Sequence, residues 1–267
     1  MLIYPATSEF STVIPRYSDP PKAQSKLDSM VLVQNKSILS SAVEPHPELH
    51  FCKSSRDVSP YIHTMTQPTF VVEHLDPELG PWSTLEYACI ARESYDRGAR
   101  FMLSSVPAEL QMPAELAATK GLEVEQRSVE EIFADCKDKV CLLDPSAQVE
   151  LSPEDGDTFD VFLFGGILGD DPPRDRTSEL RKKGYVGRRL GPKQMTTDTA
   201  VRVTRLVVHE KVPLEDIQYV DYPELIINEH ERTEMPFRYV KDANDKPIMP
   251  DGMVDLIKND ADKSLDF

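Results

Sequence analysis

A short glycine-rich segment is the first place where the sequence could bind a small molecule. The run Phe164-Gly165-Gly166-Ile167-Leu168-Gly169 follows an apolar stretch. Glycines permit backbone conformations and close approaches that a side chain would prevent. No Gly-Lys-Ser/Thr follows, and the carboxylates of Asp170 and Asp171 would repel a phosphate, so this is not a phosphate loop. The run therefore indicates either a ligand site or a sharp turn.

Two further segments follow predicted strands in the same way. One is Leu143-Asp144-Pro145, which by itself reads as an ordinary Asp-Pro turn. The other runs from Arg188 to Ala200 and contains a Leu-Gly pair, a methionine and two adjacent threonines. In open parallel sheets, ligands bind outside the carboxyl ends of the strands. We therefore expect a ligand, if there is one, to contact all three loops.

The elements that must position these loops alternate between strands and helices. Asp171 before two prolines predicts a helix start, and Gly184 predicts its end. Alternation of this kind predicts an α/β fold with a mostly parallel sheet and helices on both faces. Strands are predicted at 70–74, 101–103, 140–143 and 160–164, with 186–190 as the last central strand; helices are predicted at 82–91, 171–183 and from 196 onward, with weaker helical signals at 113–120 and 128–136.

The two ends of the chain differ from the middle. Residues 1–64 are rich in Ser and Pro and lack a sustained period, which predicts a disordered extension. As a hypothesis, Met65 is the functional start of a single domain spanning 65–267. Residues 213–267 carry Pro and charged residues at short intervals, so they are predicted to form a tail laid over the domain.

The charge of the chain lies entirely in the predicted domain. Residues 1–64 contain six basic and six acidic side chains, so the net charge of −16 belongs to residues 65–267. Such a surface repels phosphate backbones and attracts Lys/Arg-rich partners, although it also fits a surface that only keeps the protein in solution. No Cys or His pair has zinc spacing, so no metal is predicted. Without a long apolar run or a signal peptide, the expected location is the cytoplasm.

Five motifs carry a resemblance to a known family: FVVEHLDPELGPWSTLEYACI, VCLLDP, FGGILGDDPPRDRT, RRLGPKQMTTDTA and EMPFRYV. Together they resemble the SPOUT class of methyltransferases, and within it the fungal protein arginine methyltransferases that modify a small-subunit ribosomal protein. The likeness covers residues 69–266. It implies a C-terminal trefoil knot, which composition alone would not indicate because threaded backbones are rare.

The resemblance implies S-adenosyl-L-methionine as the cofactor, contacted largely by backbone groups of the three loops. It also implies a basic ribosomal protein as substrate and a monomer in place of the usual SPOUT homodimer, with the strap formed by residues 213–267 replacing the partner subunit. RNA methylation and a non-catalytic binding module stay open as alternatives. The implied cofactor residues are Leu143, Asp144, Pro145, Phe164, Gly165, Gly166, Ile167, Leu168, Gly169, Leu190, Gly191, Gln194, Met195, Thr196 and Thr197.

An arginine substrate needs carboxylates, because its guanidinium stays protonated and is best oriented by bidentate hydrogen bonds. Glu73, Asp170 and Asp175 are the catalytic candidates, although Asp170 could only cap a helix and Asp175 could only pair with a neighbouring arginine.

Aromatic residues provide the candidates for substrate binding. Trp82 could stack on the guanidinium or belong to the core. Phe237 and Tyr239 in the strap could line the site or pack on the surface.

Overall fold

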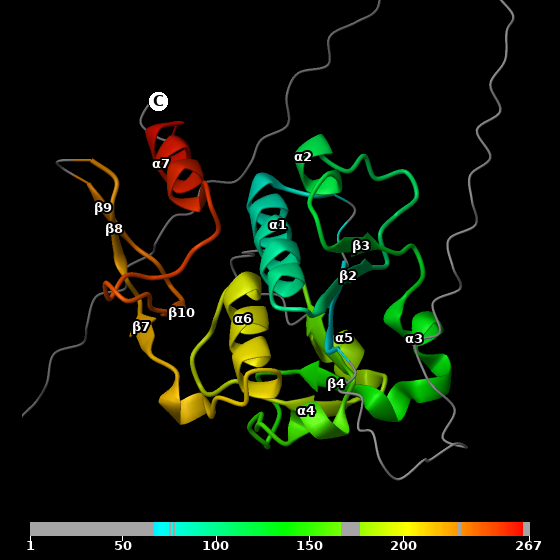
Figure 1. Cartoon of the computed structure of the whole chain (residues 1–267). Coiled ribbons are helices and arrows are strands. Elements are labelled where there is room, and N and C mark those ends of the chain that lie inside the picture. The colour runs from blue at the N-terminus through cyan, green and yellow to red at the C-terminus, as the bar shows by residue number, and fades with distance from the viewer. Residues whose placement is uncertain (1–66, 75, 77, 167–176, 229–230, 264–267) are drawn as a thin grey trace, which may run out of the picture. The chain divides into compact units, whose positions relative to one another are not determined.

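The computed structural model describes residues 67–74, 76, 78–166, 177–228 and 231–263 (Figure 1). Its centre is a six-stranded sheet in which every neighbouring pair is parallel, in the order β3-β2-β1-β5-β4-β6. The predicted α/β fold with a mostly parallel sheet is thereby confirmed. The strands are β1 (Thr69–Glu73), β2 (Arg100–Ser104), β3 (Leu122–Val124), β4 (Val140–Leu143), β5 (Val161–Gly165) and β6 (Val186–Arg188).

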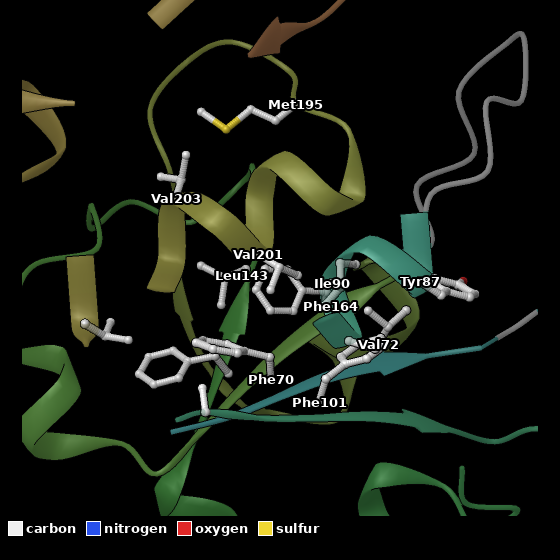
Figure 2. Packing of buried hydrophobic residues seen from close by; sticks show 14 of the residues in the cluster. Phe70, Val72, Tyr87, Ile90, Phe101, Leu143, Phe164, Met195, Val201 and Val203 are labelled. Atoms are coloured by element: carbon white, nitrogen blue, oxygen red, sulfur yellow. The ribbon is translucent and has the colours of Figure 1, made fainter. Parts of the chain in front are cut away.

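The middle strands β1 and β5 are buried along their whole length. Their sequences, TFVVE and VFLFG, are almost continuous apolar runs, as is typical of a strand covered by helices on both faces. The ring centroids of Phe70 in β1 and Phe162 in β5 are 6.1 Å apart. Figure 2 shows Phe70 and Val72 of β1 and Phe164 of β5 in the same apolar cluster. This core fixes the ends of the strands that carry the predicted loops.

Two long helices pack against each other and against the sheet. α1 (Pro81–Asp96) begins at a proline, which the first turn tolerates, and the chain turns away at Gly98 with φ of 70°. α6 (Thr197–Val208) buries most of its residues beside α1 (Figure 1). The remaining helices are α2 (Ala114–Ala117), α3 (Val129–Ile132), α4 (Asp155–Thr158), α5 (Thr177–Lys182) and α7 (Met253–Lys263), with 3-10 turns at Ala134–Lys139 and Leu214–Asp216.

Several predictions of elements are corrected by the structure. The strand predicted last, at 186–190, is shorter and lies at the edge of the sheet beside β4, not in its centre. β3 and α4 were not predicted, because neither has a long apolar run. The start predicted for α5 at Asp171 lies outside the described residues, and from Thr177 the helix ends at Lys182 before Gly184, whose φ is 79°.

The strap is more structured than its sequence predicts. It contains two antiparallel pairs, β7 (Tyr219–Asp221) with β10 (Arg238–Val240) and β8 (Glu224–Ile226) with β9 (Arg232–Glu234), followed by α7. Figure 1 shows it in orange and red beside α1 and α6, and β10 contacts α6 while α7 contacts α1. Within the described part of the chain, no helix has the length and apolar character needed to cross a membrane.

Candidate active site

The three predicted loops begin at one edge of the sheet. In chain order, the first loop follows β4, the second follows β5 and the third follows β6. Leu143 at the end of β4 is paired on one side with Phe164 of β5 and on the other with Arg188 of β6. Parallel neighbours end at the same edge, so the residues that follow these strands start side by side. Leu143, Phe164 and Met195 also belong to one buried apolar cluster (Figure 2). Leu190 packs against this cluster.

The first loop is held by a buried carboxylate. Asp144 accepts hydrogen bonds from Nε and Nη2 of Arg181 at 2.5 and 2.8 Å, and its Oδ1 accepts the Ser146 N–H at 2.9 Å. Burial by itself would raise the pKa of Asp144, but Arg181 and the Ser146 N–H hold that pKa below its usual range. Asp144 therefore links β4 to α5, while Pro145 is exposed at the turn.

The second loop begins tightly packed against β1. Gly165 pairs with Glu73, and a side chain added at Gly166 would lie 3.3 Å from the Tyr87 hydroxyl and 3.4 Å from the Glu73 carbonyl oxygen. A residue with a side chain at position 166 would therefore force these neighbours to shift, and glycine avoids this. The other predicted residues of this loop, Ile167, Leu168, Gly169, Asp170 and Asp175, lie outside the described residues.

The third loop is held by the strap. Gly191 has φ of 94°, a conformation that favours glycine. The Arg238 N–H donates to the Gln194 carbonyl oxygen at 2.8 Å, and Met195 forms a parallel bridge with Arg238. Asp221 accepts Lys193 at 2.6 Å and also binds the Arg238 guanidinium, so it joins the loop to β7 and β10.

Glu73 is buried, with 2% of its surface exposed, and its carboxylate is already occupied. It accepts the hydroxyls of Ser104 and Ser105 at 2.5 and 2.7 Å and the Val129 N–H at 3.1 Å. A substrate guanidinium could bind Glu73 only by replacing one of these donors. The structure gives this catalytic candidate a clear structural task, which is to join β1, β2 and the start of α3.

The predicted substrate residues Trp82 and Tyr239 come close to one buried acid that the sequence analysis missed. Glu86 lies one helical turn after Trp82 in α1, and its Oε1 accepts the Thr197 N–H at 3.1 Å. Tyr239 is buried, and burial together with nearby Asp198 and Glu86 raises its pKa. Phe237 is partly exposed and meets the Tyr239 ring edge-on at 6.5 Å. The one signal for Glu86 was a charged residue one turn after Trp82 in an otherwise apolar helix face.

The start of α6 completes this region. Thr196 occupies the N-cap position, and its hydroxyl lies 2.9 Å from that of Thr199. Thr196 and Thr197, which end the third loop and begin α6, are both buried. Among the residues that the structure describes, no group of His, Cys, Asp or Glu side chains is placed to hold a metal ion.

Comparison with known proteins identifies similar enzymes. A family profile described as "Protein arginine N-methyltransferase SFM1-like" matches residues 69–264. Protein arginine N-methyltransferase SFM1 of Saccharomyces cerevisiae is 48% identical over 212 residues, which is 74% of this chain and 97% of the yeast protein.

Solved structures of the yeast enzyme agree with the sequence match. Its complex with SAM (S-adenosylmethionine) has a TM-score of 0.67 and 44% identity, covering 73% of this chain and 92% of that one. Its complex with SAH has a TM-score of 0.64 and 46% identity, covering 71% of this chain and 94% of that one.

Proposed function

Since the chain belongs to the SFM1-like family of protein arginine N-methyltransferases, we propose that it transfers a methyl group from S-adenosylmethionine to an arginine of a small-subunit ribosomal protein. The yeast relative has been solved with SAM and with SAH. The observation that carries the proposal is the meeting of three loop-bearing strand ends around the apolar cluster of Leu143, Phe164 and Met195.

The residues of these loops fit the cofactor. An adenine ring needs flat apolar walls and a few amide hydrogen bonds, and Leu143, Phe164 and Met195 supply such walls. Gly166 holds the start of the second loop close to β1, because a side chain at this position would crowd Tyr87 and Glu73. We assign cofactor binding to the residues of the three loops predicted above, including Leu190, Gly191, Gln194, Thr196 and Thr197.

The cofactor supplies an electrophilic methyl group, and the chain has to orient the arginine, exclude water and accept a proton. Carboxylates are suited to holding a guanidinium so that one nitrogen faces the methyl group. Glu73, Asp170 and Asp175 are the proposed carboxylates. Trp82, Phe237 and Tyr239 are the proposed wall of the substrate site, because an aromatic face attracts a guanidinium.

Charge supports a basic protein as the substrate. The predicted domain carries the whole net charge of −16, which would repel RNA and attract a Lys/Arg-rich protein. The proposal places the enzyme in the cytoplasm, where such proteins are made. It also includes a monomer, supported by the strap lying over α1 and α6, and a trefoil knot formed by the chain after β6.

A methyl-transfer assay tests the proposal. The purified chain is incubated with radiolabelled S-adenosylmethionine and ribosomes from cells that lack the enzyme. We expect label in one small basic protein, and mass spectrometry of that band should find methylarginine. Label in RNA would instead support an RNA methyltransferase. Cofactor binding by calorimetry without any label would support a non-catalytic module, and either result contradicts the proposal.

A further inference from the structure

Two acidic side chains are buried where α1 meets the start of α6. Glu86 has 1% and Asp198 has 2% of its surface exposed. Oε1 of Glu86 accepts the Thr197 N–H at 3.1 Å. Oδ2 of Asp198 accepts Nη1 of Arg202 at 3.2 Å. One oxygen of each carboxyl group therefore has a donor.

The other two oxygens have no donor. Oε2 of Glu86 and Oδ1 of Asp198 are both buried and both lack a hydrogen-bond partner among the described residues. The two side chains are nevertheless neighbours, because Glu86 accepts the N–H of Thr197, the residue that precedes Asp198. Two ionised carboxylates in this position would repel each other and leave both oxygens desolvated, which is costly. One proton between the two groups satisfies both oxygens at once.

The surrounding charges indicate which group carries the proton. The Arg202 guanidinium lies against Asp198 and Glu93, and Arg205 also faces Glu93. Burial raises the pKa of Glu86 well above its usual value, and the neighbouring Asp198 adds to this increase. Burial raises the pKa of Asp198 too, but Arg202 favours its ionised form. No cation contacts Glu86 among the described residues, so Glu86 is the neutral partner.

We propose that Glu86 is a positioning residue of the active site, protonated at neutral pH and sharing its proton with Asp198. In this form it accepts the Thr197 N–H of the third loop, and it lies one helical turn after Trp82 of the proposed substrate wall. It also influences the buried Tyr239 of the strap electrostatically, and the Tyr239 hydroxyl has no hydrogen-bond partner among the described residues. The inference rests on the proposed function in one respect, namely that the third loop binds S-adenosylmethionine.

The shared proton has a mechanical consequence. The Thr197 N–H is one of the free donors of the first turn of α6, and Glu86 satisfies it from another helix. A neutral Glu86 accepts this N–H while it donates to Asp198, and it lies one helical turn from Trp82. Loss of the side chain would release the Thr197 N–H and Asp198 together and remove a neighbour of Trp82, so the third loop and the substrate wall would lose a common support.

Three variants and two spectroscopic measurements test the inference. Glu86→Gln keeps the neutral state, because its amide can accept the Thr197 N–H and donate to Asp198. Glu86→Ala removes the link. Glu93→Gln is the control, since it lies on the same helix and contacts Arg202 and Arg205 but neither Trp82 nor the third loop. Trp82 is the sole tryptophan of the chain, so its fluorescence reports this site alone.

We expect the infrared spectrum of the wild-type protein at neutral pH to show the C=O stretch of a protonated carboxylic acid that is absent from Glu86→Gln. Glu86→Gln should bind S-adenosylmethionine within about twofold of wild type, and Glu86→Ala at least about tenfold more weakly, consistent with losing a buried hydrogen-bond network. Trp82 fluorescence should change in Glu86→Ala and stay close to wild type in Glu86→Gln and Glu93→Gln.

Two results would overturn the inference. One is an infrared spectrum without the acid band, because both carboxylates would then be ionised. The other is a Glu86→Gln protein that folds by circular dichroism but binds cofactor as weakly as Glu86→Ala. The infrared and fluorescence measurements use the protein without cofactor. A protein that fails to methylate would therefore contradict the proposed function and leave the infrared and fluorescence results unaffected.

Discussion

Glu73 is the single residue at which a catalytic and a structural role compete most directly. Its buried carboxylate accepts two hydroxyls and one backbone N–H from two other parts of the chain. A buried donor left without an acceptor costs about 1–3 kcal/mol. We therefore predict that Glu73→Ala lowers the free energy of unfolding by about 3 kcal/mol, in addition to the loss of turnover expected of a catalytic residue. Urea denaturation measures the first effect and the methyl-transfer assay the second.

Ser105→Ala provides the matched comparison, since it removes only one of the three donors. It should cost about 1 kcal/mol or less and keep most of the turnover. If Glu73→Ala had the stability of wild type, the structural task assigned to Glu73 would be wrong.

At the level of elements, the strap and the third loop act as one unit. Asp221 of β7 binds both Lys193 in the loop and Arg238 of β10. We predict that Asp221→Asn weakens S-adenosylmethionine binding about fivefold to tenfold, which corresponds to about 1–1.4 kcal/mol, with little change in the sheet. Calorimetry measures the affinity. Asp245→Asn is the control, because its partner Lys241 lies in the strap away from the loop.

The same contact predicts how acid affects the strap. Hydrogen bonds from Arg238 and Lys193 lower the pKa of Asp221 to about 2. A carboxyl group whose pKa is lowered on folding stabilises the fold above its unfolded pKa, and this contribution is lost as pH falls through the folded pKa. The contribution of Asp221 to the free energy of unfolding should therefore be complete above about pH 4 and disappear towards pH 2. Asp221→Asn should lack that part of the acid dependence, and an unchanged acid titration would contradict this prediction.

On the scale of the whole molecule, the net charge of −16 should govern encounter with the substrate. Exposed charges are screened over about 10 Å at 0.1 M salt. We predict that the KM for a basic protein substrate rises about tenfold between low and moderate salt, while the KM for S-adenosylmethionine changes much less. Steady-state kinetics over a salt series measures both. Equal salt dependence of the two values would show that the charge only keeps the protein in solution.

The sequence predicts the central strands correctly where consecutive residues of the strand are all buried. The strands β1, β4 and β5 were found because a strand covered on both faces consists of apolar residues in a row. The strands β3 and β7–β10 were missed because each has only three residues, too few to show a period in the sequence. Part of the candidate site could be predicted for the same reason, because the three loops follow strands that are recognisable in the sequence. Glu86 could not be predicted, since its hydrogen-bond partner Thr197 lies 111 positions later in the chain and meets it only after folding.

The place of β1 in the sheet has a consequence for how the protein is made. Among the described strands β1 is synthesised first, yet it lies between β2 and β5 and cannot gain its second neighbour until β5 has been synthesised. The strap, which packs against α1 and α6, is synthesised after the six strands of the sheet. A nascent chain of this topology therefore exposes apolar faces of α1 and α6 until the strap has been made, and exposed apolar surface of this kind favours aggregation.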